Sequence, residues 1–225
     1  VHAGEILGVA GVDGNGQREL AECIAGLRPL TGGSIRIRDQ IVDSLVDDPS
    51  FVGFIPEDRQ KTGLLMDLSV AENLVIKDFV RQPFSHSGLL RYDVIRRHAR
   101  KLIPEYDIRT PSVETPVGHL SGGNQQKVII AREINSKPVL VIASQPTRGL
   151  DLGAVESVHD TLLEERERGA AVLFISTELQ EVMSLSDRII VLFRGEIMGE
   201  VDGDGADVSF IGKMMLGQTS EVIHE

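Results

Sequence analysis

The chain has 225 residues, 41% of them hydrophobic and 25% charged, which is typical of an ordinary soluble globular protein. Acidic residues outnumber basic ones by 34 to 23, and the net charge of -11 argues against a sequence-independent nucleic-acid binder, which needs a positive surface. The single cysteine, Cys23, excludes an internal disulfide and a cysteine zinc cluster, and no apolar run approaches the roughly 20 residues that span a bilayer.

The first predicted element is a short apolar strand over Glu5 to Ala10, followed by the glycine loop Gly11 to Glu19 and a helix over Leu20 to Leu27. A strand, a glycine loop and a helix in that order are the context that a phosphate-binding loop requires. Gln17 and Arg18, however, stand where such loops carry Lys and then Ser or Thr. Because many strand-to-helix turns need glycines, this loop alone does not decide between a phosphate site and an ordinary turn.

The next segments change from strand to helix periodicity. Ile35 and Ile37 alternate with arginines as in a half-buried strand, Phe51 to Ile55 reads as another strand, and Pro56 to Leu64 is a polar connection. A helical region runs from Ser69 to about Ile103 and opens with a predicted capping box between Ser69 and Glu72. One later helix face is apolar (Ile95, Ala99, Leu102), and the others carry basic residues that we interpret as a solvated face: Arg91, Arg96, Arg97, Arg100 and Lys101.

The stretch Leu120 to Lys127 predicts a turn that opens a helix, with Ser121 able to cap it and Gly122 and Gly123 allowing close backbone approach. Exposed amides at a helix start form a site for an anion such as phosphate. The alternative for this stretch alone is an ordinary capped helix after a glycine turn.

The remainder alternates strands with helices. Val139 to Ala143 is apolar enough for a central parallel strand, and the loop Thr147 to Asp151 leads into a helix that stops before Gly169. The later predictions are a strand over Ala171 to Ile175, a helix over Leu179 to Met183, a hairpin of Ile189 to Phe193 with Glu196 to Gly199, and a terminal helix over Phe210 to Leu216. We therefore expect an α/β fold with a mainly parallel sheet and a mostly helical insertion.

Together these motifs resemble an ATP-binding cassette nucleotide-binding domain over nearly the whole chain. Gly11 to Glu19 matches the family's phosphate loop, Leu120 to Gln126 its signature, and Val139 to Thr147 its second nucleotide motif, while Asp151 and Ile175 to Glu178 match the loop and the switch that follow. The resemblance implies one domain over 1–225 with a P-loop NTPase core, about 1–56 and 121–225, a small antiparallel β part, and a helical subdomain over about 57–120.

Five positions depart from the family pattern. Active members hold and cleave MgATP with Lys, Ser or Thr, Asp, Glu and a switch His, and here those positions are Gln17, Arg18, Ser144, Gln145 and Thr177. Glu57 stands where the family usually has Gln. Phosphoryl transfer depends on positioning and on neutralising negative charge, which neutral Gln17 and Gln145 cannot supply. We expect this domain's own site to be close to inactive, and weak nucleotide binding there stays open; it would use Gly11, Gly14, Asn15, Gly16, Gln17, Arg18 and Glu19.

The signature is intact. In the family two cassettes pack head to tail, so the resemblance implies that this signature, with Asp151 across the interface, completes an ATP site on a partner cassette. ATP with Mg²⁺ is expected chiefly at that composite site, and no residue of this chain is expected to ligate the metal. The signature residues assigned to the partner's ATP are Leu120, Ser121, Gly122, Gly123, Asn124 and Gln125.

A cassette whose own nucleotide site departs from the family pattern but whose signature is intact resembles those in the tandem cassette proteins of bacterial sugar and nucleoside importers. Three stretches are similar to their C-terminal halves, and we expect this chain to be one: Gly11 to Gln17, Glu57-Asp58-Arg59 with Gly63-Leu64, and Leu120 to Lys127. Gln145 to Asp151 is similar to the branch that moves nucleosides or simple sugars. The implied partners are an N-terminal or second cassette, transmembrane permease subunits and, indirectly, an extracytoplasmic solute-binding protein, with no nucleic acid. The implied location is cytoplasmic, on the inner face of the cell membrane.

Three alternatives remain. A homodimeric cassette could hydrolyse ATP, which would require Gln17 and Gln145 to act as Lys and Glu do. A non-transport cassette protein of DNA repair or translation would need a coiled-coil insertion or a basic surface. A scaffold that binds no nucleotide would leave the intact signature without a use.

Overall fold

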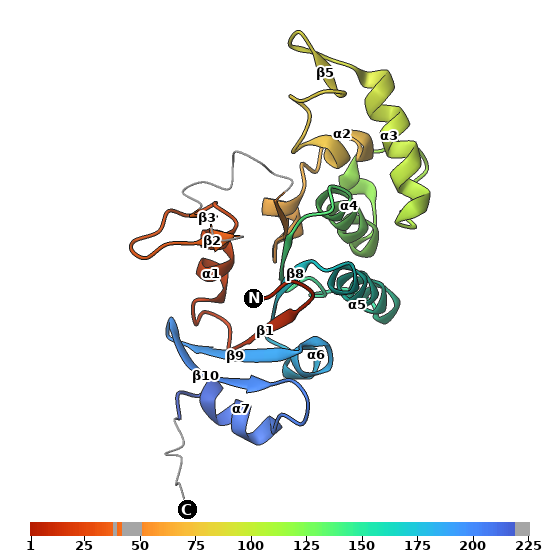
Figure 1. The fold of residues 1–225 in the computed structure, drawn as a ribbon. Helices are drawn as coiled ribbons and strands as arrows, with labels where there is room; N and C mark the ends of the chain where they lie inside the picture. Colours follow the sequence, from red (N-terminus) through yellow and green to blue (C-terminus); the bar gives the residue numbers. More distant parts are fainter. Residues whose placement is uncertain (38–39, 42–50, 219–225) are drawn as a thin grey trace, which may run out of the picture.

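The structure is a computed structural model of the chain and describes residues 1–37, 40–41 and 51–218. Its centre is a six-stranded sheet in the order β10-β9-β1-β8-β7-β4 (Figure 1). The pairs β9–β1, β1–β8, β8–β7 and β7–β4 are parallel, and only β10 runs antiparallel to its neighbour β9. The mainly parallel α/β fold expected from the sequence is therefore confirmed. The strands are β1 Ile6–Ala10, β4 Val52–Ile55, β7 Leu140–Ser144, β8 Ala171–Ser176, β9 Arg188–Phe193 and β10 Glu196–Asp202.

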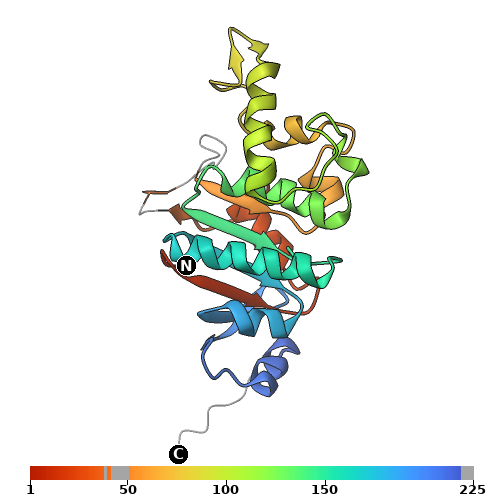
Figure 2. The same cartoon turned by 90° about the vertical axis from the view of Figure 1, so that its right-hand side faces the viewer.

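Helices cover both faces of the sheet, which explains why its central strands are apolar throughout. Alternate residues of β1, β7 and β8 belong to two separate clusters of buried side chains. In one cluster, on one face of the sheet, Val9, Ile142 and Ile175 pack with Ala21 of α1 Gln17–Ile24. Their neighbours along each strand, such as Phe174, pack with the helices of the other face. Those helices are α5 Leu152–Glu167, which lies in front of the strands in Figure 2, and α6 Leu179–Leu185.

A helical subdomain extends beyond the β4 edge of the sheet, and α7 Val208–Met215 packs near the opposite edge (Figures 1 and 2). The predicted capping box is present: Ser69 Oγ accepts a hydrogen bond from the Glu72 amide (3.2 Å), and Glu72 Oε2 accepts one from the Ser69 amide (2.9 Å). The subdomain contains η2 Arg59–Gly63, α2 Val70–Val75, β5 Ser85–His86, β6 Leu89–Leu90, α3 Tyr92–Glu105 and η3 Val117–His119, and it packs against α4 Gly122–Ile134.

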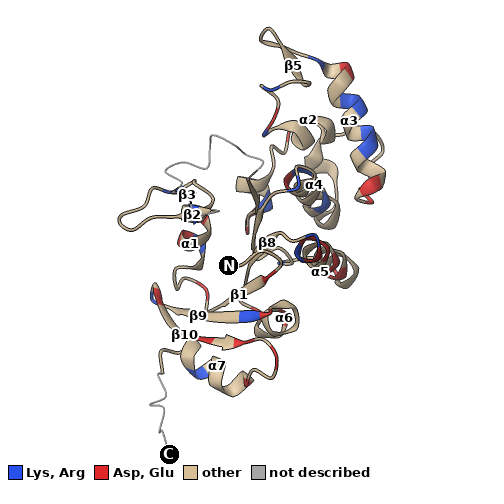
Figure 3. Cartoon of the chain, viewed as in Figure 1, with Lys and Arg blue, Asp and Glu red and all other residues tan. Residues whose placement is uncertain are grey.

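The faces of α3 agree with the sequence pattern. Ile95, Ala99 and Leu102 are buried, whereas the basic residues assigned to the solvated faces are exposed (Figure 3). None of the helices in the described part of the chain combines the length and the hydropathy that a membrane span requires.

Three local predictions differ from the structure. The first helix begins at Gln17, three residues earlier than predicted, because the glycine loop turns directly into it. The predicted strand around Ile35 is reduced to β2 Arg36–Ile37, paired antiparallel with β3 Gln40–Ile41, and Arg38 lies outside the described residues. The polar connection contains the π-helical turn η2, which begins where Asp58 Oδ1 accepts the amides of Gln60 and Lys61.

A buried carboxylate joins the helical subdomain to the sheet. Glu133 of α4 is 2% exposed and binds Lys77 Nζ, just after α2, at 2.6 Å. The same Oε2 accepts the amide of Phe54 in β4 at 3.0 Å, and Glu133 Oε1 accepts a bond from Arg132 Nε at 2.7 Å. Because a buried charge needs partners on all sides, this contact fixes α2, α4 and β4 relative to one another.

Candidate functional site

The glycine loop connects β1 to α1 and is closed from within by its own glutamine. Gly14 and Gly16 have φ values of 83° and 106°, which favour glycine. The Gln17 side chain, 8% exposed, folds back into the loop: its Oε1 accepts the Asn15 amide at 3.0 Å, and its Nε2 donates to the Val12 carbonyl at 2.9 Å. Gln17 therefore occupies the loop interior instead of reaching towards a bound phosphate.

The structure brings the five degenerate positions together. A hollow of about 300 Å³ lies over the glycine loop. Thr177 joins this group through Gln145, whose Oε1 accepts bonds from both the amide and the hydroxyl of Thr177 at 3.3 Å. The hollow is lined by Asp13, Gly14, Gly16, Gln17, Arg18, Glu19, Glu57, Ser144, Gln145 and Ile175.

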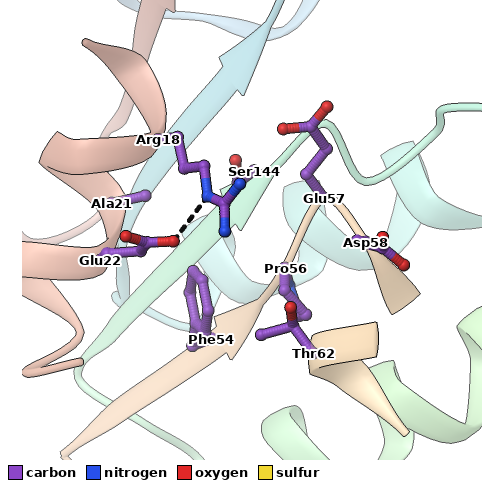
Figure 4. Close-up of a pocket in the computed structure, with 9 residues that line it drawn as sticks. All are labelled: Arg18, Ala21, Glu22, Phe54, Pro56, Glu57, Asp58, Thr62 and Ser144. Carbon is purple, nitrogen blue, oxygen red and sulfur yellow. Dashed lines mark hydrogen bonds and ion pairs between the residues drawn. The ribbon is translucent and has the colours of Figure 1, made fainter. Parts of the chain in front are cut away.

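Three charged residues in and beside this hollow are paired within the protein. Arg18 Nε donates to Glu22 Oε1 at 2.7 Å, and Figure 4 shows Arg18 extending from α1 with Glu57 facing it. The hydrogen bond from Arg18, followed by that from Arg28, holds the pKa of Glu22 below its usual range, and the same bond from Arg18 to Glu22 raises the pKa of Arg18. Glu57 forms an ion pair with Arg148.

These residues do not fit a magnesium ion. Mg²⁺ prefers carboxylate and hydroxyl oxygens, but Glu22 and Glu57 are each paired with arginine, and Arg18 places a cation where a ligand oxygen would stand. Within the described ranges, no group of three or more His, Cys, Asp or Glu side chains is placed to hold a metal. In this hollow the cation of Arg18 is paired with Glu22, and Gln17 and Gln145 carry no charge, whereas phosphoryl transfer uses a cationic phosphate contact and metal ligands.

A second hollow, of about 420 Å³, lies at the start of α4 and brings Ser121, Gly123 and Asn124 of the signature together with Asp151, whereas Leu120, Gly122 and Gln125 do not line it. Asp151 Oδ1 accepts the Ala154 amide at 3.0 Å and so begins α5. A Cβ on Gly123 would lie 3.3 Å from Ala154 Cβ, so the glycine permits this close approach. The lining residues are Asp107, Arg109, Ser121, Gly123, Asn124, Lys127, Asp151, Gly153, Ala154 and Ser157.

Two signature residues point away from this second hollow. Leu120 and Gln125 are buried, and Gln125 Nε2 donates to the Leu120 carbonyl at 3.1 Å, which supports the turn from inside. Ser121 occupies the cap position as expected, but its hydroxyl makes no capping bond to the helix backbone. The capping bond predicted from the sequence is wrong because Asn124 Nδ2 donates to that hydroxyl instead, at 2.8 Å.

Sequence reasoning missed the contacts by which Arg148 and Arg59 connect Glu57 to the signature turn. Arg59 Nη1 donates to the Arg148 carbonyl at 2.9 Å, while the Arg148 side chain pairs with Glu57. Arg59 also lies against the signature, since a Cβ on Gly122 would be 3.0 Å from Arg59 Nη2. The motif Glu57-Asp58-Arg59 was visible in the sequence, but its partner lies 89 to 91 residues further along the chain, beyond any spacing argument.

Comparison with known proteins places these features in context. The sequence pattern of the ABC transporter family matches residues 1–148. The guanosine import ATP-binding protein NupO of Bacillus subtilis is 47% identical over 98% of this chain and 44% of its own length. The nucleoside import ATP-binding protein NupA of Lactococcus lactis is 45% identical over 96% of this chain and 44% of its own length. The chain thus spans less than half the length of these curated relatives.

The fold comparison agrees with the sequence comparison. The dimeric post-hydrolysis structure of the ATP-binding cassette MJ0796 bound to ADP and Pi superimposes with a TM-score of 0.76 at 24% identity, over 92% of this chain and 88% of that one. The ribose import ATP-binding protein RbsA 2 of Rhizobium meliloti is 39% identical over 95% of this chain and 42% of its own length.

Proposed function

Because the chain belongs to the ABC transporter family of ATP-binding cassettes, we propose that it is a cassette of a nucleoside or simple-sugar importer that donates its signature turn to a second cassette. The relatives named for guanosine and nucleoside import, and those named for ribose import, support this substrate class. ATP with Mg²⁺ would be held by the partner, and this chain would close over its γ-phosphate.

The observation that carries the proposal is the contrast between the two hollows. At the glycine loop, the Gln17 side chain fills the loop, and Arg18 and Glu57 are paired with other residues. At the signature, the turn has kept its glycines and its serine, and the hollow there joins Ser121 with Asp151. Exposed amides at the start of a 13-residue helix favour an anion such as phosphate.

The glycine-loop site is proposed to be inactive. Loss of one electrostatic stabiliser reduces a rate by about 10² to 10³. Residues that act as a unit are not additive, so five losses do not multiply. They still leave no cation on the β/γ-phosphates and no base for water, since an amide such as that of Gln145 is not a useful base at neutral pH.

The covered length of the relatives supports the proposed assembly. A chain that matches 44% of NupO would be one cassette of a tandem polypeptide. We propose that it is the C-terminal one because stretches such as Glu57-Asp58-Arg59 resemble the C-terminal halves of tandem cassette proteins. Permease subunits would hold it at the inner face of the cell membrane, and a solute-binding protein would act from the other side. The domain boundaries of about 1–56, 57–120 and 121–225 belong to the same proposal.

The test replaces Ser121 with arginine in the complete two-cassette protein. A guanidinium in the second hollow would fill the space of the partner's γ-phosphate, so Ser121→Arg should reduce ATPase activity by about 100-fold or more. Ser209→Arg, at an exposed position of α7, is the matched control and should leave activity unchanged. Full activity in Ser121→Arg would contradict the donated signature and would favour hydrolysis within each cassette.

A further inference from the structure

We propose that Asn124 is a positioning residue that orients the hydroxyl of Ser121 so that its proton points out to the γ-phosphate. This inference rests on the proposed function, and it assigns Asn124 an indirect role, through Ser121, in place of direct contact with the nucleotide. It concerns the start of α4, where Ser121 and Asn124 both line the second hollow.

The two hydrogen bonds of the Asn124 side-chain amide show which of its end atoms is the oxygen and which is the nitrogen. The backbone amide of Arg109 donates to Asn124 Oδ1 at 2.7 Å, and a backbone N–H can only donate. The side-chain atom that faces Arg109 is therefore the oxygen, and the atom that faces Ser121 is the nitrogen. This removes the usual ambiguity in assigning the oxygen and nitrogen of an asparagine.

The polarity at Ser121 follows. Asn124 Nδ2 has no acceptor capacity, so across the 2.8 Å contact the Ser121 oxygen accepts and its proton is directed elsewhere. Phosphate oxygens only accept hydrogen bonds. A serine whose lone pair is already engaged by Asn124 is thus held as a donor, which is the state that an incoming phosphate requires.

Lys127 holds the same segment whose Arg109 amide binds Asn124. One helical turn further along α4, Lys127 Nζ donates to the carbonyl and to the carboxylate of Asp107, at 3.0 and 2.6 Å. Asn124 and Lys127 therefore hold the segment from Asp107 to Arg109 at two points, and this segment follows directly after α3. The orientation of Ser121 is consequently tied to the position of the segment that follows α3.

The experiment uses the two-cassette protein and compares two substitutions of Asn124. Asn124→Asp retains an oxygen for the Arg109 amide but places a second acceptor opposite Ser121, so the serine would donate to it and lose its free proton. Asn124→Leu has a similar size and no charge and removes both bonds. Each should lower kcat/KM for MgATP by about tenfold or more, as expected for a hydrogen bond to a charged group.

A double-mutant cycle separates positioning from a merely structural role. If Asn124 acts through the hydroxyl, Asn124→Leu should change kcat/KM by less than about twofold in a Ser121→Ala background. A full further loss in that background, or unchanged kcat/KM in both single variants while Ser121→Ala is impaired, would overturn the inference. Asn135→Leu, at the other end of α4, is the matched control and should retain activity.

The Ser121→Ala protein also tests whether the hydroxyl contributes. If its ATPase activity equals that of the wild type, the role of Asn124 fails, whereas the donated signature is still judged by Ser121→Arg, because alanine leaves the backbone amides of the turn in place. If it is impaired, the proposed function stands, and the outcome of the cycle then refers to Asn124 alone.

Discussion

The side-chain amide of Gln17 donates a hydrogen bond of 2.9 Å to the carbonyl of Val12, inside the glycine loop. The neighbouring amide of Asn15 is engaged by the other end of the same side chain. A glutamine here therefore does more than omit a positive charge, because it also occupies the interior of the loop. The proposed inactivity of this site therefore has both an electrostatic and a steric basis.

We predict that Gln17→Lys will not restore catalysis to the chain of residues 1–225. The substitution supplies a cation and frees the loop interior, but Arg18, Ser144, Gln145 and Thr177 still provide neither metal ligands nor a base. Magnesium-dependent phosphate release should stay at background in the parent and in this variant. Turnover in the parent chain that Gln145→Ala abolishes would contradict an inactive site.

The sequence predicted the order of strands and helices well because apolar strands buried on both faces and capped helices leave local patterns. The run Val139 to Ala143 and the pair Ser69 and Glu72 are examples. The membership of the site was also predictable, since parallel strands end at one edge of the sheet and bring Ser144 near the glycine loop.

What the sequence could not predict is how side chains pair across the fold. The contact of Glu57 with Arg148 joins residues 91 apart, and the bond from Arg109 to Asn124 depends on how the chain turns after α3. Ser121 shows the same limit at short range. Its position before the helix is readable, but whether its hydroxyl caps the backbone or binds Asn124 is decided by local packing.

Glu57→Gln should reduce transport more than nucleotide binding. The change removes the ion pair with Arg148, whose backbone carbonyl holds Arg59 against the signature. Because both side chains of the pair are partly exposed, little stability should be lost, about 0–1 kcal/mol. Solute uptake by vesicles containing the complete importer, compared with ATP binding by the same preparation, measures the difference. We expect this connection to transmit nucleotide binding to the permease subunits, and an equal loss of both would argue against that role.

Glu133→Ala should destabilise the domain by about 3 kcal/mol, since it leaves Lys77 and the Phe54 amide without their buried partner. The free energy of unfolding from urea titration measures this loss, and Glu167→Ala, at an exposed position of α5, is the control. An effect no larger than that of the control would show that α2, α4 and β4 do not depend on this carboxylate.

The carboxylate of Glu181 should make stability sensitive to acid. It accepts bonds from Ser176 Oγ at 2.8 Å and from Thr147 Oγ1 at 2.9 Å, and His159 Nε2 lies 3.4 Å away. Burial raises its pKa, but the neighbouring His159 and the hydrogen bonds from Ser176 and Thr147 outweigh burial and lower the pKa below its ordinary value of 4.5. A carboxyl group with a lowered folded pKa stabilises the protein above its unfolded pKa, and this contribution is lost as pH falls through the folded pKa.

The free energy of unfolding should therefore decline as the pH falls below about 5, and Glu181→Gln should make that decline shallower. The other carboxylates with lowered pKa values, such as Glu5 and Glu22, still make the free energy of unfolding of the variant decline as the pH falls. Urea titrations of both proteins between about pH 3 and pH 7 measure the two slopes, with Glu167→Gln as the matched control. The hydrogen bonds from Ser176 and Thr147 that lower the pKa of Glu181 also join the end of β8 to the loop after β7. If the free energy of unfolding falls equally with pH in the parent and in Glu181→Gln, the carboxylate does not join these segments in this way.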